Sequence, residues 1–195
     1  MSARDEILSD VRRALADARR DVPVDRGYRA PVAGRGPDLF AENVADYRAV
    51  VVRCTEDEVE QRIADALPPH AQVVVPAGLP WRVEGAVADD GLSALDLDAL
   101  DGVVTGATLG IATTGTIVLS HGPGQGRRAL TLVPDLHVCV VRADQVVADV
   151  PDAVAQLDPT RPTTWISGPS ATSDIELDRV EGVHGPRTLH VILVG

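Results

Sequence analysis

Runs of aliphatic and β-branched residues recur along most of the chain, and in its first half they alternate with segments of helical character. Val50–Val52, Val73–Val75 and Val103–Val104 are continuous apolar runs. Such runs are typical of parallel strands that are covered on both faces of a sheet. A capping-box pattern starting at Thr55 predicts a helix through Leu67. The first half therefore predicts strands that alternate with helices.

The second half differs because its predicted strands follow one another through loops. The strands expected here are Gly115–Ser120, Ala129–Val133, His137–Val141, Thr163–Ile166 and Leu189–Val194, with one helix over Ala143–Leu157. Strands joined by loops favour antiparallel pairing. We therefore expect an α/β fold with three layers and a mixed, mostly parallel sheet, in which antiparallel pairs come late in the chain.

The N-terminal segment has a different character. Ser2 is placed to cap a helix, and apolar residues from Ile7 to Ala18 recur at helical spacing. Asp21–Pro37 is rich in proline and glycine and predicts a linker. The sequence thus predicts an amphipathic helix with a linker over residues 1–37 and a main domain over residues 38–195. The apolar face of the helix either docks on its own domain or binds a partner.

The charge of the chain narrows the classes of partner. The formal net charge is −11 and the sequence pI is about 4.7, which argues against binding to nucleic acid or to an anionic membrane. All 18 basic residues are arginine. A lysine Schiff base and a P-loop lysine are therefore excluded. Any bound anion has to be held by Arg, His, hydroxyl groups or backbone N–H groups.

The cysteines limit the metal and redox chemistry of this chain, and the N-terminal residues bear on its location. Cys54 and Cys139 are far apart in sequence, whereas an iron–sulfur cluster commonly needs four thiolates. We expect two reduced thiols, no bound metal and no cofactor. Met1–Arg20 mixes charged and apolar residues and does not resemble a secretory signal. We therefore expect a cytoplasmic protein.

Two glycine-rich stretches in the second half are candidates for ligand loops. Thr113–Thr116 opens a predicted strand, and His121–Arg128 follows it. Glycines let the backbone approach a ligand closely, and consecutive N–H groups can bind an anion. The alternative is a glycine-rich hairpin connection with solvated arginines. The candidate ligand-binding residues in these stretches are Thr114, Gly115, Thr116, Gly122, Gly124 and Arg128.

Two later stretches supply hydroxyl, acidic and basic candidates. Ser167–Glu176 follows a strand, and ligand loops in α/β sheets commonly lie at the carboxyl ends of strands. Its candidate ligand-binding residues are Ser167, Gly168, Ser170 and Thr172. The alternative is that these side chains cap a following helix. The candidate catalytic residues are Asp174, as a proton acceptor, and His184 with Arg187, as a carboxylate clamp.

These stretches together resemble the LUD-domain family, and within it the lactate utilisation protein C group. The residues that carry the resemblance are Thr105–Ala107, Thr114–Ser120, Gly122–Gly124, Leu130–His137, Ile166–Ser170, Thr172–Glu176, Gly182–Arg187 and Leu189–Leu193. The resemblance is strong over about residues 95–195 and weak from about residue 38. Several motifs in the right order make it more specific than any single glycine pattern.

The resemblance implies a fold similar to glucosamine-6-phosphate deaminase, ribose-5-phosphate isomerase and the CoA transferases. It also implies a non-redox subunit or accessory protein that works beside iron–sulfur proteins in oxidising L-lactate to pyruvate. The alternative is a stand-alone enzyme or sensor for a small anionic metabolite, with a phosphate, carboxylate or CoA group. Relatives often carry acids where Thr108 and Thr113 stand, so this chain is expected to have a less negative site.

Overall fold

The structure of the protein is a computed structural model in which the chain divides into two compact units. These units are Met1–Ala30 and Pro31–Gly195. The residues that the structure describes are 2–17, 36–172, 180–181 and 185–195. In the described parts of the chain, no helix has the length and apolar character needed to cross a membrane.

The first unit contains the amphipathic helix α1 (Ala3–Ala14). Ser2 caps it as expected: its hydroxyl accepts the Asp5 N–H, and the Asp5 carboxylate accepts the Ser2 N–H. No residue of α1 is buried. Ile7 and Val11 on its apolar face are exposed.

The second unit alternates helices and strands. Its helices and 3-10 turns are α2 (Gly36–Asp46), η1 (Glu56–Glu58), α3 (Val59–Ala66), α4 (Ala94–Asp98), η2 (Arg128–Thr131), η3 (Ala143–Gln145) and α5 (Val150–Gln156). Its strands are β1 (Val50–Cys54), β2 (Val73–Val75), β3 (Ala86–Ala88), β4 (Gly102–Gly106), β5 (Leu109–Ile111), β6 (Thr116–Leu119), β7 (Leu136–Arg142), β8 (Val146–Val147), β9 (Thr164–Ile166), β10 (Ala171–Thr172), β11 (Val180–Glu181) and β12 (Thr188–Val194).

A parallel sheet forms the centre of this unit. Within the described residues its strand order is β1-β12-β7-β4-β2-β3, and every pair is parallel. β7 and β12 are the longest strands and pair along their whole length. Side chains alternate between the two faces of a strand. Val138 and Val140 of β7 therefore face one side, while Cys139 and Val141 face the other.

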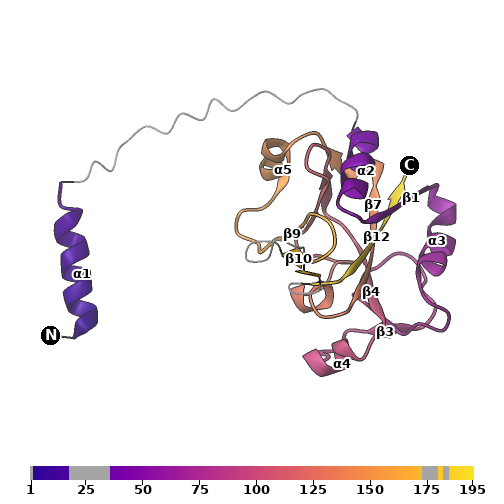
Figure 1. Ribbon diagram of the computed structural model, residues 1–195, viewed down its shortest axis with the longest axis horizontal. Coiled ribbons are helices and arrows are strands. Elements are labelled where there is room, and N and C mark those ends of the chain that lie inside the picture. Colours follow the sequence, from indigo (N-terminus) through magenta and orange to yellow (C-terminus); the bar gives the residue numbers. More distant parts are fainter. Residues whose placement is uncertain (1, 18–35, 173–179, 182–184) are drawn as a thin grey trace. The chain divides into compact units, whose positions relative to one another are not determined.

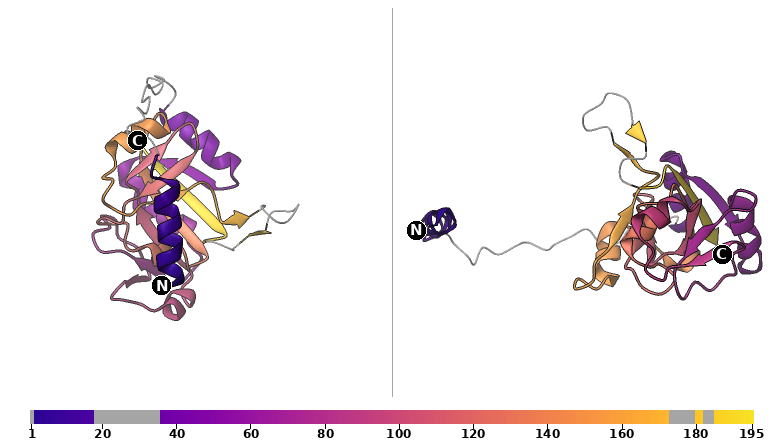
Figure 2. Two further views of the ribbon diagram at one scale, coloured as in Figure 1. Left: turned by 90° about the vertical axis from the view of Figure 1, so that its left-hand side faces the viewer. Right: turned by 90° about the horizontal axis from the view of Figure 1, so that it is seen from below.

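Each face of the parallel sheet is covered, but by different structures (Figure 1). Helix α3 covers one face, where Val59 and Ile63 pack against Val138, Val140 and strand residues beside them. Each fully buried aliphatic side chain of this kind stabilises the fold by about 1.5–3 kcal/mol. Two views from other directions show the same central strands (Figure 2).

A second sheet and helix α2 cover the other face. The second sheet has the order β8-β5-β6-β9, with antiparallel β5–β6 and β6–β9 pairs. Phe40 of α2, Ile117 and Leu119 of β6, and Cys139 and Val141 of β7 belong to one buried cluster. Helix α5 packs on the outer side of the second sheet.

The predicted fold class, an α/β protein with a mostly parallel sheet, is confirmed. One expectation about its sheet was wrong: the antiparallel pairs form a separate sheet that packs on the parallel one. Period-2 patterning gives the face of a strand but does not say which sheet the strand joins. Several elements were not predicted, namely α2, β3, β5, β8, β10 and β11. Gly36 and Pro37, assigned to the linker, belong to the first turn of α2.

Two predicted elements also take other forms. Ala129–Val133 is the 3-10 turn η2 and its continuation, because Ala129, Leu130 and Val133 pack together on one small cluster instead of alternating. Ala143–Leu157 contains a helix only from Val150; η3 and β8 precede it. Asp149 starts α5 by accepting the N–H of Val150.

Gly115 is required by the contact between the second sheet and α2. Its φ is +57°, and an added Cβ would lie 2.6 Å from the carbonyl carbon of Asn43 and 2.7 Å from the Val44 nitrogen. Gly115→Ala should therefore lower the free energy of unfolding by about 2–4 kcal/mol. Gly91 also has a positive φ, but nothing lies within 4 Å of its added Cβ. Gly91→Ala should cost only about 1 kcal/mol in urea denaturation; equal losses would contradict this packing.

Candidate functional site

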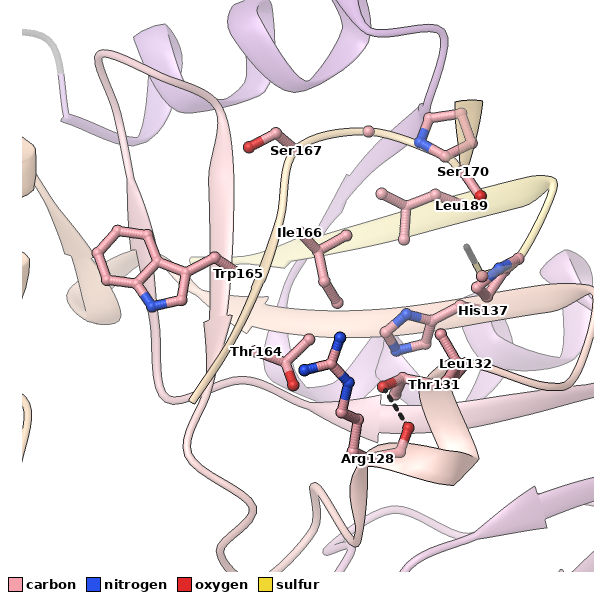
Figure 3. Close-up of a pocket in the computed structure, with 14 residues that line it drawn as sticks. Arg128, Thr131, Leu132, His137, Thr164, Trp165, Ile166, Ser167, Ser170 and Leu189 are labelled. Atoms are coloured by element: carbon pink, nitrogen blue, oxygen red, sulfur yellow. Dashed lines mark hydrogen bonds between the residues drawn. The ribbon is translucent and has the colours of Figure 1, made fainter. Parts of the chain in front are cut away.

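A pocket of about 230 Å³ lies between the two sheets, at the amino ends of β7 and β12. His137 and Leu189, the second residues of these two strands, form its floor. One wall is β9 with the loop Ser167–Ser170 that follows it, and the opposite wall is η2 (Figure 3). The loop at Gly185–Pro186 closes one end.

η2 brings a cation to the pocket. Leu130 is fully buried and packs with Val74, Leu97 and Val103, so it anchors the turn on the parallel sheet. Arg128 projects from the start of this turn, with its guanidinium beside His137 and Thr164 (Figure 3).

Local contacts fix the loop after β9. The Ser167 hydroxyl lies 2.8 Å from that of Thr116 in the neighbouring strand β6. Gly168 has a φ of +81° and packs against Tyr47, so a larger residue would not fit there. The Ser170 N–H donates to the carbonyl of Pro186 at 2.8 Å. The loop is therefore held from both sides, and its residues Ser167 and Ser170 line the wall of the pocket.

The electrostatics of the pocket favour an anion. Among the described residues that line it, Arg128 is the sole charged side chain, and the polar ones include Thr131, Thr164, Ser167 and Ser170. No described lining residue is a carboxylate. An arginine that is not neutralised within such a site attracts a carboxylate or phosphate, which it can bind bidentately.

His137 adds a buried neutral group. It is 1% exposed, and burial lowers its pKa from 6.5 to about 4. Its Nε2 lies 2.8 Å from the Thr105 hydroxyl on β4. Thr105 is in turn 3.7 Å from the sulfur of Cys139, whose pKa burial raises to about 12. At neutral pH the imidazole therefore carries no charge and the thiol stays protonated.

Several residues predicted from the sequence come together here. Arg128, Ser167, Gly168 and Ser170 line the pocket. Thr116 supports the wall through Ser167. Thr114 stands behind it, with its hydroxyl 2.8 Å from that of Thr116.

The glycine-rich segment after β6 does not line this pocket. Gly122 accepts the N–H groups of Gln125 and Gly126, which makes a turn. Gly124 joins the carboxyl end of β4 to the segment after β2: it donates to the Ala77 carbonyl and accepts the Gly106 N–H, each at 2.8 Å. Gly115, described above, packs on α2. These glycines therefore make turns and backbone contacts and do not line the pocket. The segment is not a hairpin connection either, because it joins β6 of the second sheet to β7 of the parallel sheet.

Of the three predicted catalytic residues, the structure describes Arg187. Arg187 makes a bidentate ion pair with Asp135, with both N–O distances 2.7 Å, and does not line the pocket. Asp174 and His184 lie outside the described residues, and only the backbone of Thr172 is described, in β10. Ser170 leads into β10, and the helix that the capping alternative expects around Asp174 lies outside the described residues.

Thr108 and Thr113, where the resemblance implies acids in relatives, do not line the pocket. The Thr108 hydroxyl bonds to Ser120 and Gln125. The Thr113 hydroxyl donates to Asp149 at 2.9 Å, at the start of α5. Neither position therefore contributes to the pocket, where Arg128 is the sole charged side chain among the described lining residues.

Sequence reasoning missed His137, Thr131 and Thr164 as pocket residues. His137 stands in an apolar strand, which is typical of a core-facing side chain, and it is 1% exposed. The sequence signal that could have identified His137 is its position two residues before Cys139, on the same face of the strand. The position of the pocket also differs from expectation, since it lies at the amino ends of the parallel strands. Across the described residues, no three His, Cys, Asp or Glu side chains converge in a way that would hold a metal ion.

Comparison with known proteins gives the family. The LUD domain model matches residues 92–194, a range that contains every residue lining the pocket. A relative from Deinococcus radiodurans, named lactate utilization protein C, is 45% identical over 97% of this chain and 94% of its own length. The chain belongs to the LUD-domain family.

Two other relatives of this LUD-domain protein differ in coverage. A lactate utilization protein C from Bacillus pumilus is 37% identical, but over 43% of this chain and 38% of its own length. A crystal structure of a DUF162 family protein from Deinococcus radiodurans superimposes with a TM-score of 0.70. It is 39% identical, and the likeness covers 81% of this chain and 95% of that one.

The neutral state of His137 predicts how stability depends on pH. The folded-state pKa is about 4 and the ordinary value is 6.5, so below about pH 6.5 the unfolded chain takes up a proton that the folded protein does not. Stability is therefore unaffected above that pH and falls as the pH drops towards 4. For this group, the loss between about pH 7 and pH 5 should be about 2 kcal/mol.

Urea denaturation of the wild type and of His137→Gln at both pH values measures this contribution. The variant should lose less stability on acidification, although His190, whose pKa burial also lowers, continues to contribute. An identical pH dependence in both proteins would show that His137 is not buried as a neutral group.

Proposed function

We propose that this LUD-domain protein is a cytoplasmic, non-redox subunit or accessory protein of an L-lactate oxidation system, and that its pocket binds the small carboxylate of that system. The name of the Deinococcus radiodurans relative, 45% identical over nearly the whole chain, supports the link to lactate utilisation. The observation that carries the binding step is Arg128 in a pocket whose described lining residues include several hydroxyl side chains and no carboxylate.

The size of the pocket favours a compact ligand. A volume of about 230 Å³ lies below the roughly 300–1,000 Å³ typical of sites for drug-sized ligands. Lactate, pyruvate or inorganic phosphate can lie wholly inside it. A CoA thioester would have most of its atoms outside, so the pocket gives little support to a CoA-linked substrate.

The cysteines support a role without electron transfer by this chain. The sequence contains two cysteines, whereas an iron–sulfur cluster is commonly held by four thiolates. Both are buried free thiols, and burial raises the pKa of each. A thiol that resists deprotonation is a poor metal ligand. The oxidation of lactate would then depend on iron–sulfur partner proteins.

A second candidate function is a stand-alone enzyme or sensor for a small anion. The observation that favours it is that Arg128, His137 and the Ser167–Ser170 loop of this chain together line the pocket. Under this alternative, the ligand binds and acts without an iron–sulfur partner.

Ligand binding can be followed through Trp165, which lines the pocket. The second tryptophan, Trp81, packs on the cluster beneath α3 at the other face of the sheet. Titration with L-lactate, pyruvate and phosphate should change Trp165 fluorescence and raise the melting temperature. Arg128→Gln removes a charge-assisted hydrogen bond worth about 1.5–3 kcal/mol, so carboxylate affinity should fall on the order of 10- to 100-fold.

Arg142→Gln is the matched control. Arg142 ends β7 at the strand end opposite His137 and pairs with Glu56 at the surface. This variant should bind as the wild type does. Equal affinities for Arg128→Gln and Arg142→Gln would contradict binding at this pocket.

The partner question needs a separate experiment. The full-length protein, purified at native expression level from its own host, should co-elute with iron–sulfur proteins that have the cluster absorbance, and lactate oxidation should depend on its presence. A protein that elutes alone while those partners still oxidise lactate would contradict the accessory role and leave the stand-alone alternative.

A further inference from the structure

We infer that the pocket selects α-hydroxy acids over α-keto acids, because a hydrogen-bond chain through Thr105 and Cys139 makes His137 present an unprotonated ring nitrogen to the ligand. This inference rests on the proposed function, since it takes the pocket to bind a small carboxylate. In it, His137 contacts the ligand, and Thr105 and Cys139 are positioning residues.

The chain of contacts lies on the face of the parallel sheet that packs on the second sheet. Thr105 of β4 pairs in register with Cys139 of β7, and His137 is two residues earlier on the same face. His137 Nε2 is 2.8 Å from the Thr105 hydroxyl, which is 3.7 Å from the Cys139 sulfur. The sulfur is 3.8 Å from the carbonyl oxygen of Gly106. The chain therefore ends at a backbone acceptor.

The terminal carbonyl sets the direction of the protons. The carbonyl oxygen of Gly106 can only accept a hydrogen bond, so the Cys139 thiol donates to it. The Thr105 hydroxyl is then left to donate to the sulfur. His137 Nε2–H then donates to the Thr105 oxygen, and all three contacts have a proton. In the opposite tautomer, Thr105 donates to Nε2 and its contact with Cys139 has none. The Nε2–H tautomer is thus favoured, and it leaves Nδ1 with a lone pair.

The same nitrogen is available to a ligand. No described residue forms a hydrogen bond with His137 Nδ1. This atom is also not one of the fully buried polar atoms without a partner, so part of its surface is accessible. His137 lines the pocket, where its ring lies beside the guanidinium of Arg128 (Figure 3). Burial keeps the imidazole neutral, with a pKa of about 4, so Nδ1 acts as an acceptor.

A hydroxy acid matches this pair of groups. Arg128 binds the carboxylate, and the hydroxyl on the adjacent carbon donates to Nδ1. The keto oxygen of an α-keto acid has only lone pairs, so it meets the lone pair of Nδ1 without a proton between them. An unmatched buried polar group of this kind costs more than a missing contact. The wild type should therefore bind L-lactate on the order of tenfold more tightly than pyruvate.

Thr105→Val tests the chain without touching the pocket, since Thr105 is not among its lining residues. Without the hydroxyl acceptor, Nε2 no longer holds its proton by preference, and Nδ1 becomes a donor in part of the molecules. The lactate preference, measured by Trp165 fluorescence, should fall to about equal affinities or reverse. Thr105→Ser retains the hydroxyl and should retain the preference, which a purely structural role of Thr105 would not predict.

Nitrogen NMR of wild-type protein labelled at histidine reads the tautomer directly and applies even if Thr105→Val does not fold. The signals of His137, assigned by their loss in His137→Gln, should show a proton on Nε2 and none on Nδ1. A proton on Nδ1, or equal affinity for both acids in the wild type, would overturn the inference. If the wild type binds both acids equally and Arg128→Gln abolishes this binding, the proposed carboxylate site stands. If the wild type binds neither acid, both the inference and the proposed function are overturned.

Discussion

The row of side chains that β7 directs toward the second sheet determines where this protein can hold a ligand. Cys139 and Val141 belong to the buried cluster between the two sheets, together with Phe40 of α2. His137 is the residue at the end of that row, where the covering sheet gives way to the loop after β9. The pocket is therefore an edge of the core that the two sheets share. Its floor is as rigid as the core, because a close-packed interior leaves little room for rearrangement.

The chemistry of the pocket follows from which groups this arrangement leaves without an internal partner. Most arginines of the described second unit that have ion pairs use surface carboxylates, as Arg187 does with Asp135 and Arg142 with Glu56. Arg128 instead enters a site without a described carboxylate, opposite a neutral imidazole. A cation and an uncharged acceptor side by side suit a ligand that is anionic at one atom and a hydrogen-bond donor at the next. In this LUD-domain protein, the combination of Arg128 and His137 is therefore the physical feature on which ligand binding would depend.

The parallel strands and several hydroxyl-bearing loop residues could be predicted from the sequence, because apolar runs and Ser-Gly-Pro segments depend on local patterns. The division into two sheets could not, because β5 and β6 are buried along their whole length and their residues do not indicate which sheet they join. Ala129–Val133 was predicted as a strand because its composition is β-like; the burial of Leu130 in a small cluster makes it a turn, and that turn is what aims Arg128 at the pocket. The burial of His137 follows from its place in an apolar strand, but its relation to Thr105 depends on a strand pairing between residues far apart in sequence.

A crystal structure of the full chain with L-lactate at saturating concentration would test the central claim most directly. The lactate is expected between η2 and the loop after β9, with its carboxylate on the Arg128 guanidinium and its hydroxyl within hydrogen-bond distance of His137 Nδ1. A pocket that stays without lactate at that concentration, or lactate bound elsewhere with Arg128 uninvolved, would contradict the claim that the gap between the two sheets is the ligand site.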